Sequence, residues 1–349
     1  MKPSADVLLT GASGFVGSAV LRALLRDGFH VRALVRRNSQ YLDLAARGVQ
    51  FVEGDLRESA SLGPACAGCR YLFHVAADYR LALWDSASVH ATNVTGTRNL
   101  MEEAMRAGIE RVVYTSSVAT LEPKQDGAPA DETSSLPVQR AIGAYKQSKV
   151  VAEQLVVDMV REKGLPAIIV NPSTPVGPRD MRPTPTGKII VAAATGKIPV
   201  YVETGLNVVH VDDVASGHLA ALRRGRVGER YILGGENVPF SLLLAEIAMS
   251  AGRSIPKLQI PWYAAVPAAL AGEARSFLTG REPLASWAGV RLARHKMFFT
   301  SGKAARELGY GARPHMEALK DAIIWFSSHG YLGVSAAEPS PGGFRAPFG

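Results

Sequence analysis

Residues 7–17 read VLLTGASGFVG, an apolar run that is followed by glycines at positions 11, 14 and 17. The run predicts a buried strand that ends at Thr10, and the apolar positions beyond residue 15 predict a helix. Gly11 permits a tight turn, Gly14 lets the backbone approach a pyrophosphate, and Gly17 lets the helix pack closely on the strand. Amide N–H groups at the start of a helix attract anions. The stretch therefore predicts a dinucleotide cradle whose cofactor contacts are Gly11, Ser13, Gly14, Phe15, Val16 and Gly17.

Short apolar runs alternate with helical stretches through the first half of the chain. The sequence predicts strands at 31–35, 50–53, 71–75, 111–115 and 167–170, and helices at 15–27, 41–47, 86–106 and 144–163. This alternation is typical of a parallel sheet covered by helices on both faces. The predicted fold class is α/β, a doubly wound parallel sheet of the Rossmann kind with a smaller C-terminal substrate lobe.

Proline and glycine become frequent after Asn171-Pro172, which marks a change in organisation. The predicted dinucleotide-binding domain covers residues 1–171, and residues 205–235 and 310–330 are expected to return to it. Residues 172–204 and 236–309 then form the substrate-binding lobe. The last stretch, 336–349, is rich in proline and glycine and is predicted to be a disordered tail.

The bulk composition is that of a soluble globular protein, with 47% hydrophobic and 20% charged residues. Thirty-nine Lys and Arg against 31 Asp and Glu give a net charge of +8. The basic residues are scattered, with no basic run interleaved by aromatic residues, so nucleic acid is not expected as a partner. We see no signal peptide and no apolar stretch near the ~20 residues that span a bilayer, so a cytoplasmic location is expected.

Cys66 and Cys69 form a C-x-x-C pair. A second pair or a histidine cluster would be needed for a metal site, and neither is nearby. The pair also precedes a predicted strand, at the end opposite the expected cradle. A structural role is therefore predicted for both cysteines, and no metal is expected.

Tyr145 and Lys149 are the second informative feature, because a spacing of four places both on one face of a helix. An ammonium beside a phenol favours the phenolate, so the tyrosine can act as an acid or a base nearer neutral pH. Ser116 and Ser117 follow a predicted strand upstream, where a serine is placed to hydrogen-bond a carbonyl or carbinol oxygen.

Together these motifs resemble the extended short-chain dehydrogenases/reductases, the NAD-dependent epimerase/dehydratase superfamily that includes nucleotide-sugar epimerases and dihydroflavonol 4-reductases. The matching pieces are Thr10-Gly11-x-x-Gly14-x-x-Gly17, Gly54-Asp55-Leu56, His74-Val75-Ala76-Ala77, Asn93-Val94-x-Gly96-Thr97, Ser116-Ser117, Tyr145-x-x-x-Lys149 and Asn171-Pro172. Within this class, the stretches 76–81, 171–180, 183–187 and 210–214 are most similar to the hopanoid-associated sugar epimerases.

The resemblance implies a role for each matching residue. Tyr145 is the general acid/base, Lys149 lowers its pKa and binds the nicotinamide ribose, and Ser117, rather than Ser116, contacts the substrate oxygen. Further cofactor contacts are implied for Asp55, Leu56, Ala76, Ala77, Asn93, Pro172 and Ser173. Asp78, Tyr79 and Arg80 follow the fourth predicted strand, where such sheets bind ligands, and together with Arg179 they are candidates for substrate contact.

The end of the second predicted strand bears on the choice of cofactor. Proteins that bind NAD usually carry Asp or Glu about 20 residues beyond the glycines, bonded to the ribose hydroxyls. Here the chain has Arg36 and Arg37 instead, and a guanidinium suits a 2′-phosphate. NADP(H) is therefore the predicted cofactor, with NAD(H) as the alternative.

Two reactions stay open. Val118 and Ala119 stand where nucleotide-sugar dehydratases carry an acidic pair, which argues against dehydration. The resemblance favours a sugar epimerase that acts in hopanoid side-chain biosynthesis, whereas Arg36 favours an NADPH-dependent reductase of aldehydes or ketones, similar to dihydroflavonol reductase. A non-catalytic NADPH sensor is less favoured, because such proteins typically lack the tyrosine or the lysine that this chain keeps.

Further predictions concern the surroundings of this site. His74 lies on a predicted buried strand and is expected to be a hydrogen-bonded core residue rather than a catalyst. The aromatic residues of the second lobe either line an apolar substrate pocket or form the core of the lobe. If the substrate is a sugar linked to a hopanoid, this lobe and its basic residues are expected to rest on the inner face of an anionic membrane. A homodimer is a further prediction.

Overall fold

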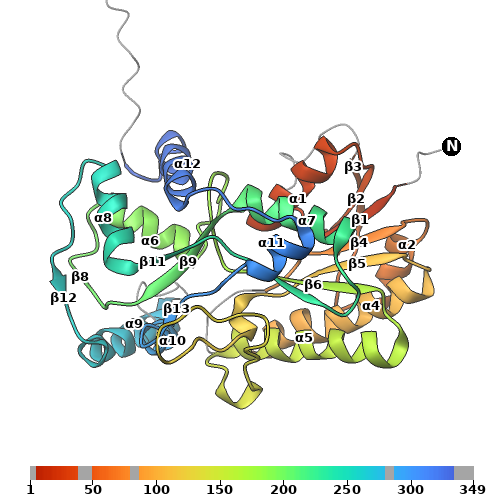
Figure 1. The fold of residues 1–349 in the computed structure, drawn as a ribbon, viewed down its shortest axis with the longest axis horizontal. Helices are drawn as coiled ribbons and strands as arrows, with labels where there is room; N and C mark the ends of the chain where they lie inside the picture. The colour runs from red at the N-terminus through yellow and green to blue at the C-terminus, as the bar shows by residue number, and fades with distance from the viewer. Residues whose placement is uncertain (1–4, 38–48, 79–85, 280–286, 334–349) are drawn as a thin grey trace, which may run out of the picture.

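The computed structural model describes residues 5–37, 49–78, 86–279 and 287–333 (Figure 1). Its larger part is a seven-stranded sheet with the order β10-β6-β5-β4-β1-β2-β3. The strands are β1 (Val7–Thr10), β2 (Val31–Val35), β3 (Val49–Glu53), β4 (Tyr71–His74), β5 (Arg111–Thr115), β6 (Ala167–Pro172) and β10 (Arg230–Leu233). All neighbours are parallel, and the order reverses between β1 and β4. Ligands bind at the carboxyl ends of the strands at such a reversal.

Helices cover both faces of this sheet (Figure 1). One face carries α1 (Phe15–Arg26), α7 (Val211–Arg224) and α11 (Gly302–Leu308), and the other carries α2 (Leu62–Cys66), α4 (Gly96–Arg106) and α5 (Ala144–Lys163). The predicted α/β class with a doubly wound parallel sheet is confirmed. The helix predicted over 86–106 is divided, because α3 (Ser86–His90) runs into a π-helical turn at Ala91–Thr95 before α4 begins.

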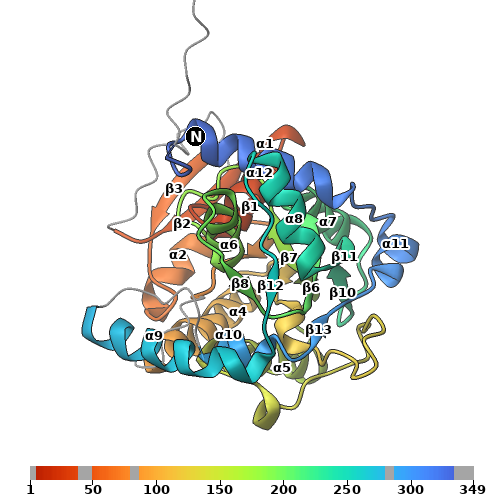
Figure 2. The ribbon, with the colours of Figure 1, turned by 90° about the vertical axis from the view of Figure 1, so that its left-hand side faces the viewer.

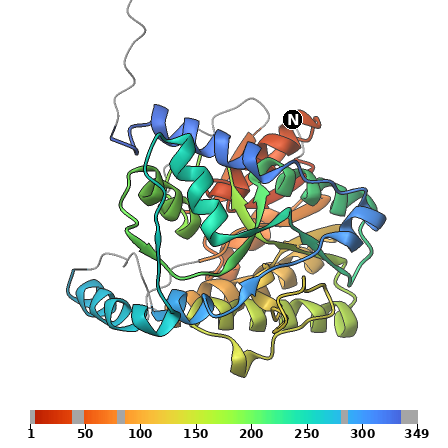
Figure 3. The same ribbon diagram turned by 60° about the vertical axis from the view of Figure 1, so that its left-hand side comes forward.

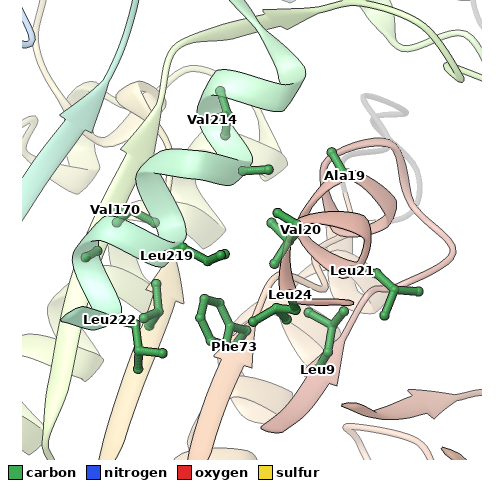
Figure 4. Close-up of a cluster of buried hydrophobic side chains, with 14 of the residues drawn as sticks. Leu9, Ala19, Val20, Leu21, Leu24, Phe73, Val170, Val214, Leu219 and Leu222 are labelled. Carbon is green, nitrogen blue, oxygen red and sulfur yellow. The ribbon is translucent and has the colours of Figure 1, made fainter. Parts of the chain in front are cut away.

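The buried strands explain why apolar runs predicted the sheet. Successive residues of a strand point to opposite faces, so Leu9 packs beneath α1 and α7 whereas Leu8 packs beneath α4 and α5. Figure 4 shows the first of these layers, in which Phe73 of β4 lies between Leu24 of α1 and Leu222 of α7. Both faces of the sheet are covered by helices and shielded from water. A strand with an uninterrupted run of apolar residues is therefore favoured over one in which apolar and polar residues alternate.

The rest of the described chain forms a smaller lobe, seen from its own side in Figures 2 and 3. Its sheet has β9 (Gly205–His210) paired with β7 (Thr174–Val176), β11 (Glu236–Pro239) and β13 (Lys296–Met297). The helices α6 (Pro185–Ala194), α8 (Phe240–Ser250) and α12 (His315–Ser328) pack together on it. The pair β8 (Val200–Tyr201) and β12 (Leu258–Gln259) leads to α9 (Val266–Thr279) and α10 (Trp287–Leu292).

Two expectations about returning segments need correction. β10 joins the main sheet as expected, but β9 belongs to the smaller sheet and only its end, at Val209, packs in the main core. The apolar face of α12, with Leu319 and Phe326, packs on α6 and α8 rather than on the main sheet. The domain boundaries stay a prediction. The predicted helix at 41–47 and the predicted tail at 336–349 lie outside the described residues.

Candidate active site

The glycine turn after β1 is closely packed at the reversal point. Gly11 has φ of +76°, a backbone conformation that favours glycine. A Cβ on Gly11 would lie 2.7 Å from the amide nitrogen of Ala76, which follows β4, and a Cβ on Gly17 would lie 1.9 Å from the carbonyl oxygen of Gly11. Both positions therefore require glycine. Ser13 and Gly14 are exposed, and no side chain caps α1.

The first turn of α1 is accordingly open to an external anion. An uncapped helix start leaves its N–H groups without intrahelical partners, and it carries the positive end of the helix dipole. The predicted cradle residues Phe15, Val16 and Gly17 begin this helix. The turn between β1 and α1 thus fits a pyrophosphate, as the sequence predicted.

The ends of β2 and β3 present mostly cationic groups. Arg36 and Arg37 directly follow β2 and are both exposed. Asp55, after β3, is half-buried and pairs with Arg57 at 2.6 Å between Oδ2 and Nη2. The hydrogen bond from Arg57 holds the pKa of Asp55 below its usual value, and the charge of Arg36 adds to this effect. Asp55 is therefore already paired, and the guanidiniums after β2 stay available to an anion.

Tyr145 and Ser117 meet at the start of α5. Ser117 follows β5, and its hydroxyl lies near the phenol of Tyr145, which is in the first turn of α5 and is half-buried. Burial raises the pKa of Tyr145, and the nearby Ser117 hydroxyl acts against that rise. The neighbouring Ser116 points elsewhere, since its hydroxyl is buried without a partner among the described residues. The structure thus brings Ser117, and not Ser116, to the tyrosine.

Lys149 is buried one turn further along α5, but its ammonium is held by the sheet. Nζ donates to the carbonyl oxygen of Thr115 at 2.8 Å and lies 5.1 Å from the centre of the Tyr114 ring. Burial lowers the pKa of Lys149 to about 8, although the nearby carboxylate of Glu153 opposes this shift. That Lys149 lowers the pKa of Tyr145 stays a prediction.

His74, at the end of β4, is a fully hydrogen-bonded core residue. Its Nε2 lies 2.9 Å from Thr97 Oγ1, and its Nδ1 lies 2.8 Å from Thr10 Oγ1. Thr97 donates to the carbonyl oxygen of Asn93 at 2.6 Å, so its hydroxyl must accept a proton from Nε2. His74 is then neutral and protonated on Nε2. Burial lowers its pKa to about 3, which agrees with this neutral form.

Asn93 extends this network from the π-helical turn to α5. Its Oδ1 accepts from the backbone N–H of Asp78 at 2.7 Å, and its Nδ2 donates to the Asp78 carbonyl oxygen at 2.8 Å and to Ser148 Oγ at 2.9 Å. Ser148 in turn donates to the carbonyl oxygen of Tyr145 at 2.7 Å. Asn93 therefore fixes the segment after β4 and the start of α5 relative to each other.

The ends of β5 and β6 contain polar atoms that lack partners. Among the described residues, the buried atoms without a hydrogen bond include Tyr114 OH, Ser116 Oγ, Asn171 Oδ1 and Ser173 Oγ. Buried polar groups are nearly always satisfied, so these atoms indicate a bound group or water. Together with the open cradle, they fit a nicotinamide cofactor that extends from α1 towards Ser173.

The candidate substrate residues are dispersed. Asp78 is half-buried at the end of β4, and Tyr79 and Arg80 lie outside the described residues. Arg179 is exposed in the loop after β7 with φ of +71°, and its charge acts on Arg22 of α1. Asp78 thus lies near the carboxyl edge of the sheet, whereas Arg179 lies close enough to α1 for its charge to act on Arg22.

Sequence reasoning missed one polar group that borders this site. Glu153 lies four residues beyond Lys149 on the same face of α5 and is 4% exposed. Its spacing from Lys149 was a signal, because an acidic residue on a buried helix face needs a partner.

Cys66 and Cys69 are both buried. Among the residues that the structure describes, no cluster of His, Cys, Asp and Glu side chains could hold a metal.

A parallel sheet with a glycine cradle and a Ser-Tyr-Lys group at its carboxyl edge defines a nicotinamide-dependent oxidoreductase of the short-chain dehydrogenase/reductase class. The profile of the NAD dependent epimerase/dehydratase family matches residues 7–234, and the chain belongs to this family. No helix in the described part of the chain is long and apolar enough to cross a membrane.

Several proteins are similar over nearly their whole length. A Synechocystis protein named "Putative dihydroflavonol 4-reductase" is 44% identical over 93% of this chain and 95% of that protein. Sterol demethylase protein B of Methylococcus capsulatus is 34% identical over 93% of this chain and 99% of that protein. The crystal structure of gox2253 is 49% identical with a TM-score of 0.84, covering 94% of this chain and 99% of that one.

Proposed function

We propose that this protein is an NADPH-dependent reductase of an apolar, polycyclic ketone or aldehyde, working between carbonyl and carbinol. The observation that carries this proposal is the contact between Ser117 and Tyr145, which lie at the edge where the cofactor cradle opens. A bound nicotinamide supplies the hydride chemistry. The residues of the chain then have to hold the substrate oxygen and to deliver or remove its proton.

The geometry gives each catalytic residue a distinct task. The Ser117 hydroxyl orients the substrate oxygen towards Tyr145, and the phenol transfers the proton. A phenol keeps its proton at neutral pH, so Tyr145 can donate it to a carbonyl oxygen, which suits reduction. Lys149, buried and held by Thr115, supplies positive charge beneath the site and would donate to the hydroxyls of the nicotinamide ribose. Pro172 and Ser173 would border the nicotinamide.

The preference for NADPH rests on the end of β2. Arg36 and Arg37 follow the strand where an NAD-binding protein carries an acid. Both are exposed, and Asp55 across from them is paired with Arg57. A 2′-phosphate would therefore meet two exposed guanidiniums at the end of β2.

The substrate class rests on the relatives and on the absence of an acidic pair. Two of the relatives above 30% identity are named after a dihydroflavonol and a sterol, both polycyclic and mostly apolar. Val118 and Ala119, which follow Ser117, are buried and apolar. Neither can remove a proton for the elimination of water, so net reduction or oxidation is favoured over dehydration.

The test is turnover with purified protein. Candidate 3-ketosteroids, a dihydroflavonol and nucleotide sugars are each offered with NADPH or NADH, and the absorbance of the reduced nicotinamide is followed. We expect stoichiometric consumption of NADPH with one of the apolar carbonyl compounds. Turnover of a nucleotide sugar without net consumption would overturn the proposal.

An epimerase that acts on a hopanoid-linked sugar is the second candidate. It is favoured by the family match and by the stretch from Asn171 to Asp180, which resembles hopanoid-associated sugar epimerases. In that reaction Tyr145 would remove the carbinol proton and later return it. An epimerase keeps its cofactor through turnover, so tightly held oxidised cofactor in the purified protein would favour this candidate.

A peripheral membrane contact fits either candidate. Leu258 and Tyr263, before α9, are 59% and 64% exposed, and Leu270 in α9 is 54% exposed. Residues 250–272 and 287–300 contain five Lys and Arg and no Asp or Glu. Arg294 stacks on Trp262 at 4.6 Å, which joins the two segments. Exposed apolar side chains beside positive charge suit an anionic lipid surface.

Co-sedimentation with vesicles tests this contact. We expect binding to vesicles that contain phosphatidylglycerol, weaker binding to neutral phosphatidylcholine, and loss of binding in Leu258→Glu. Ile324→Glu is the matched control, because Ile324 is 56% exposed on α12. Equal sedimentation of Leu258→Glu and the control would contradict the proposal.

A further inference from the structure

A third charged residue lies on the catalytic face of α5. Tyr145, Lys149 and Glu153 are spaced four residues apart, which places them on one side of the helix. Glu153 is 4% exposed, so its carboxylate is removed from water. A buried carboxylate is strongly unfavourable unless charge and hydrogen bonds compensate it.

Three elements supply that compensation. From β6, Asn171 Nδ2 donates to Glu153 Oε2 at 2.7 Å. Thr120, which follows Ser117, brings its hydroxyl to 2.9 Å from the same oxygen. From β10, Arg230 Nη1 lies 3.2 Å from Oε1. The carboxylate thus ties the catalytic helix to two strands of the sheet and to the segment after β5.

The Asn171 amide links this carboxylate to the catalytic serine. Its Nδ2 also lies 3.1 Å from the carbonyl oxygen of Ser117. An amide nitrogen has two protons, so one can bond Glu153 while the other bonds Ser117. Thr120 Oγ1 lies 2.8 Å from the same Ser117 oxygen, but its single hydroxyl proton can bond either that oxygen or Glu153. The backbone of Ser117 is therefore held by Asn171, which also bonds Glu153.

The charged and titratable groups around this centre are few. Lys149 and Tyr145 share α5 with Glu153, Tyr114 faces it from β5, and Arg230 faces it from β10. The charge of Lys149 helps to lower the pKa of His74 on β4, which is neutral. Glu153 is thus the negative charge that acts on Lys149 in the described site.

We propose that Glu153 is a positioning residue: through the Asn171 amide it holds the backbone of Ser117 beside Tyr145. The role goes beyond the proposed reaction, since either a reductase or an epimerase would need it. Arg230 balances the buried charge without reaching the serine, because its other hydrogen bond goes to Ser135 Oγ at 3.0 Å.

The first test uses amide hydrogen exchange, which needs no substrate. In Glu153→Gln the segment 116–121 is expected to exchange faster than in the native protein, because the Asn171 amide that holds Ser117 loses the carboxylate that fixes it. Asp158→Asn is the control: it lies on the same helix, is 37% exposed and pairs with Arg161. Unchanged exchange over 116–121 in Glu153→Gln would overturn the positioning role whatever the protein catalyses.

The second test uses the reaction identified by the turnover assay and therefore rests on the proposed function. Glu153→Gln is expected to lower kcat by roughly 10- to 100-fold, since misplacing a catalytic group by about 1 Å costs up to about 10²-fold. Its alkaline limb should move to lower pH, because Lys149 without the nearby negative charge loses its proton sooner. Asp158→Asn should move neither quantity.

A double variant separates positioning from simple charge balance. Glu153→Gln leaves Arg230 unpaired, so some loss of thermal stability is expected. Adding Arg230→Gln removes that charge and should recover stability, while kcat stays low and exchange over 116–121 stays fast. Recovery of kcat in the double variant would show that Glu153 serves only to neutralise Arg230, and would overturn the proposal.

Discussion

The carboxyl edge of the main sheet and the outer face of the smaller lobe are built in opposite ways. At the edge, His74, Asn93 and Glu153 are each buried and fully engaged in hydrogen bonds. On the lobe, Leu258 and Tyr263 are more than half exposed. Groups that perform chemistry need fixed geometry, and buried hydrogen-bond networks provide it. A surface that meets varied apolar partners does not need fixed geometry. We therefore expect changes at the edge to alter the reaction and changes on the lobe to alter what is bound.

The largest expected effect is the loss of the proton donor. Tyr145→Phe should lower kcat by about 10²- to 10⁴-fold, which is the usual contribution of general acid–base catalysis. NADPH affinity, measured by fluorescence titration, should change by only a few-fold. Tyr263→Phe makes the same substitution on the exposed lobe and should leave kcat unchanged. A similar loss in both variants would break the distinction between the two regions.

The next effect concerns the choice of cofactor. Arg36→Asp should shift the ratio of kcat/KM for NADPH and NADH towards NADH by about 10- to 100-fold, since it replaces a charge-assisted pair with repulsion. Arg253→Asp, on the lobe, has the same change in charge and should leave the ratio as it was. Unchanged selectivity in Arg36→Asp would exclude the assignment of Arg36.

A smaller effect is expected from steric change in the cradle. In Gly17→Ala the new Cβ would meet the carbonyl oxygen of Gly11 at 1.9 Å, so α1 must move away from the turn. Overpacking of this kind costs roughly 1–3 kcal/mol of unfolding free energy. Gly311→Ala is the control, because nothing lies within 4 Å of its added Cβ. Urea unfolding of both variants measures the difference.

The smallest effect is a pH dependence of stability in the lobe. His315 lies between Glu236 and Glu246, with Nε2 at 2.8 Å from Glu246 Oε2. Burial alone would lower the pKa of His315, but the two carboxylates outweigh it and raise the pKa above 6.5. The stabilisation is therefore complete below pH 6.5 and is lost as pH rises through the folded-state pKa.

His315→Gln should remove this dependence. Its unfolding free energy should differ from that of the native protein by on the order of 1 kcal/mol below pH 6.5, and by less at higher pH. His329→Gln, at the far end of α12, should keep the native pH profile. A His315→Gln variant that still loses stability as pH rises would place the titrating group elsewhere.

Much of the edge could be predicted from local sequence. The glycine spacing at 11, 14 and 17 reflects close contacts within one turn, and the apolar runs reflect strands that are buried on both faces. The spacing of Tyr145 and Lys149 follows from the helix period alone. These features depend on neighbours a few residues away, so a single sequence displays them.

Other features depended on contacts between distant segments. The pairing of β9 with β7 and β11, and the packing of α12 on α6 and α8, were not predicted, because similar apolar patterns would suit the main sheet equally well. Glu153 was missed for the same reason. Its partners Asn171 and Arg230 lie 18 and 77 positions further along the chain, and nothing in the local pattern around residue 153 indicates them.

The sequence by itself therefore determined the fold class, the glycine turn after β1 and the place of Tyr145 and Lys149 on one helix face, since short-range sterics and helix periodicity dictate all of them. Only the tertiary structure decided that Lys149 bonds Thr115, and that His74 is neutral and protonated on Nε2. Those outcomes depend on burial and on hydrogen bonds between strands far apart in the chain, which exist only once the sheet has formed.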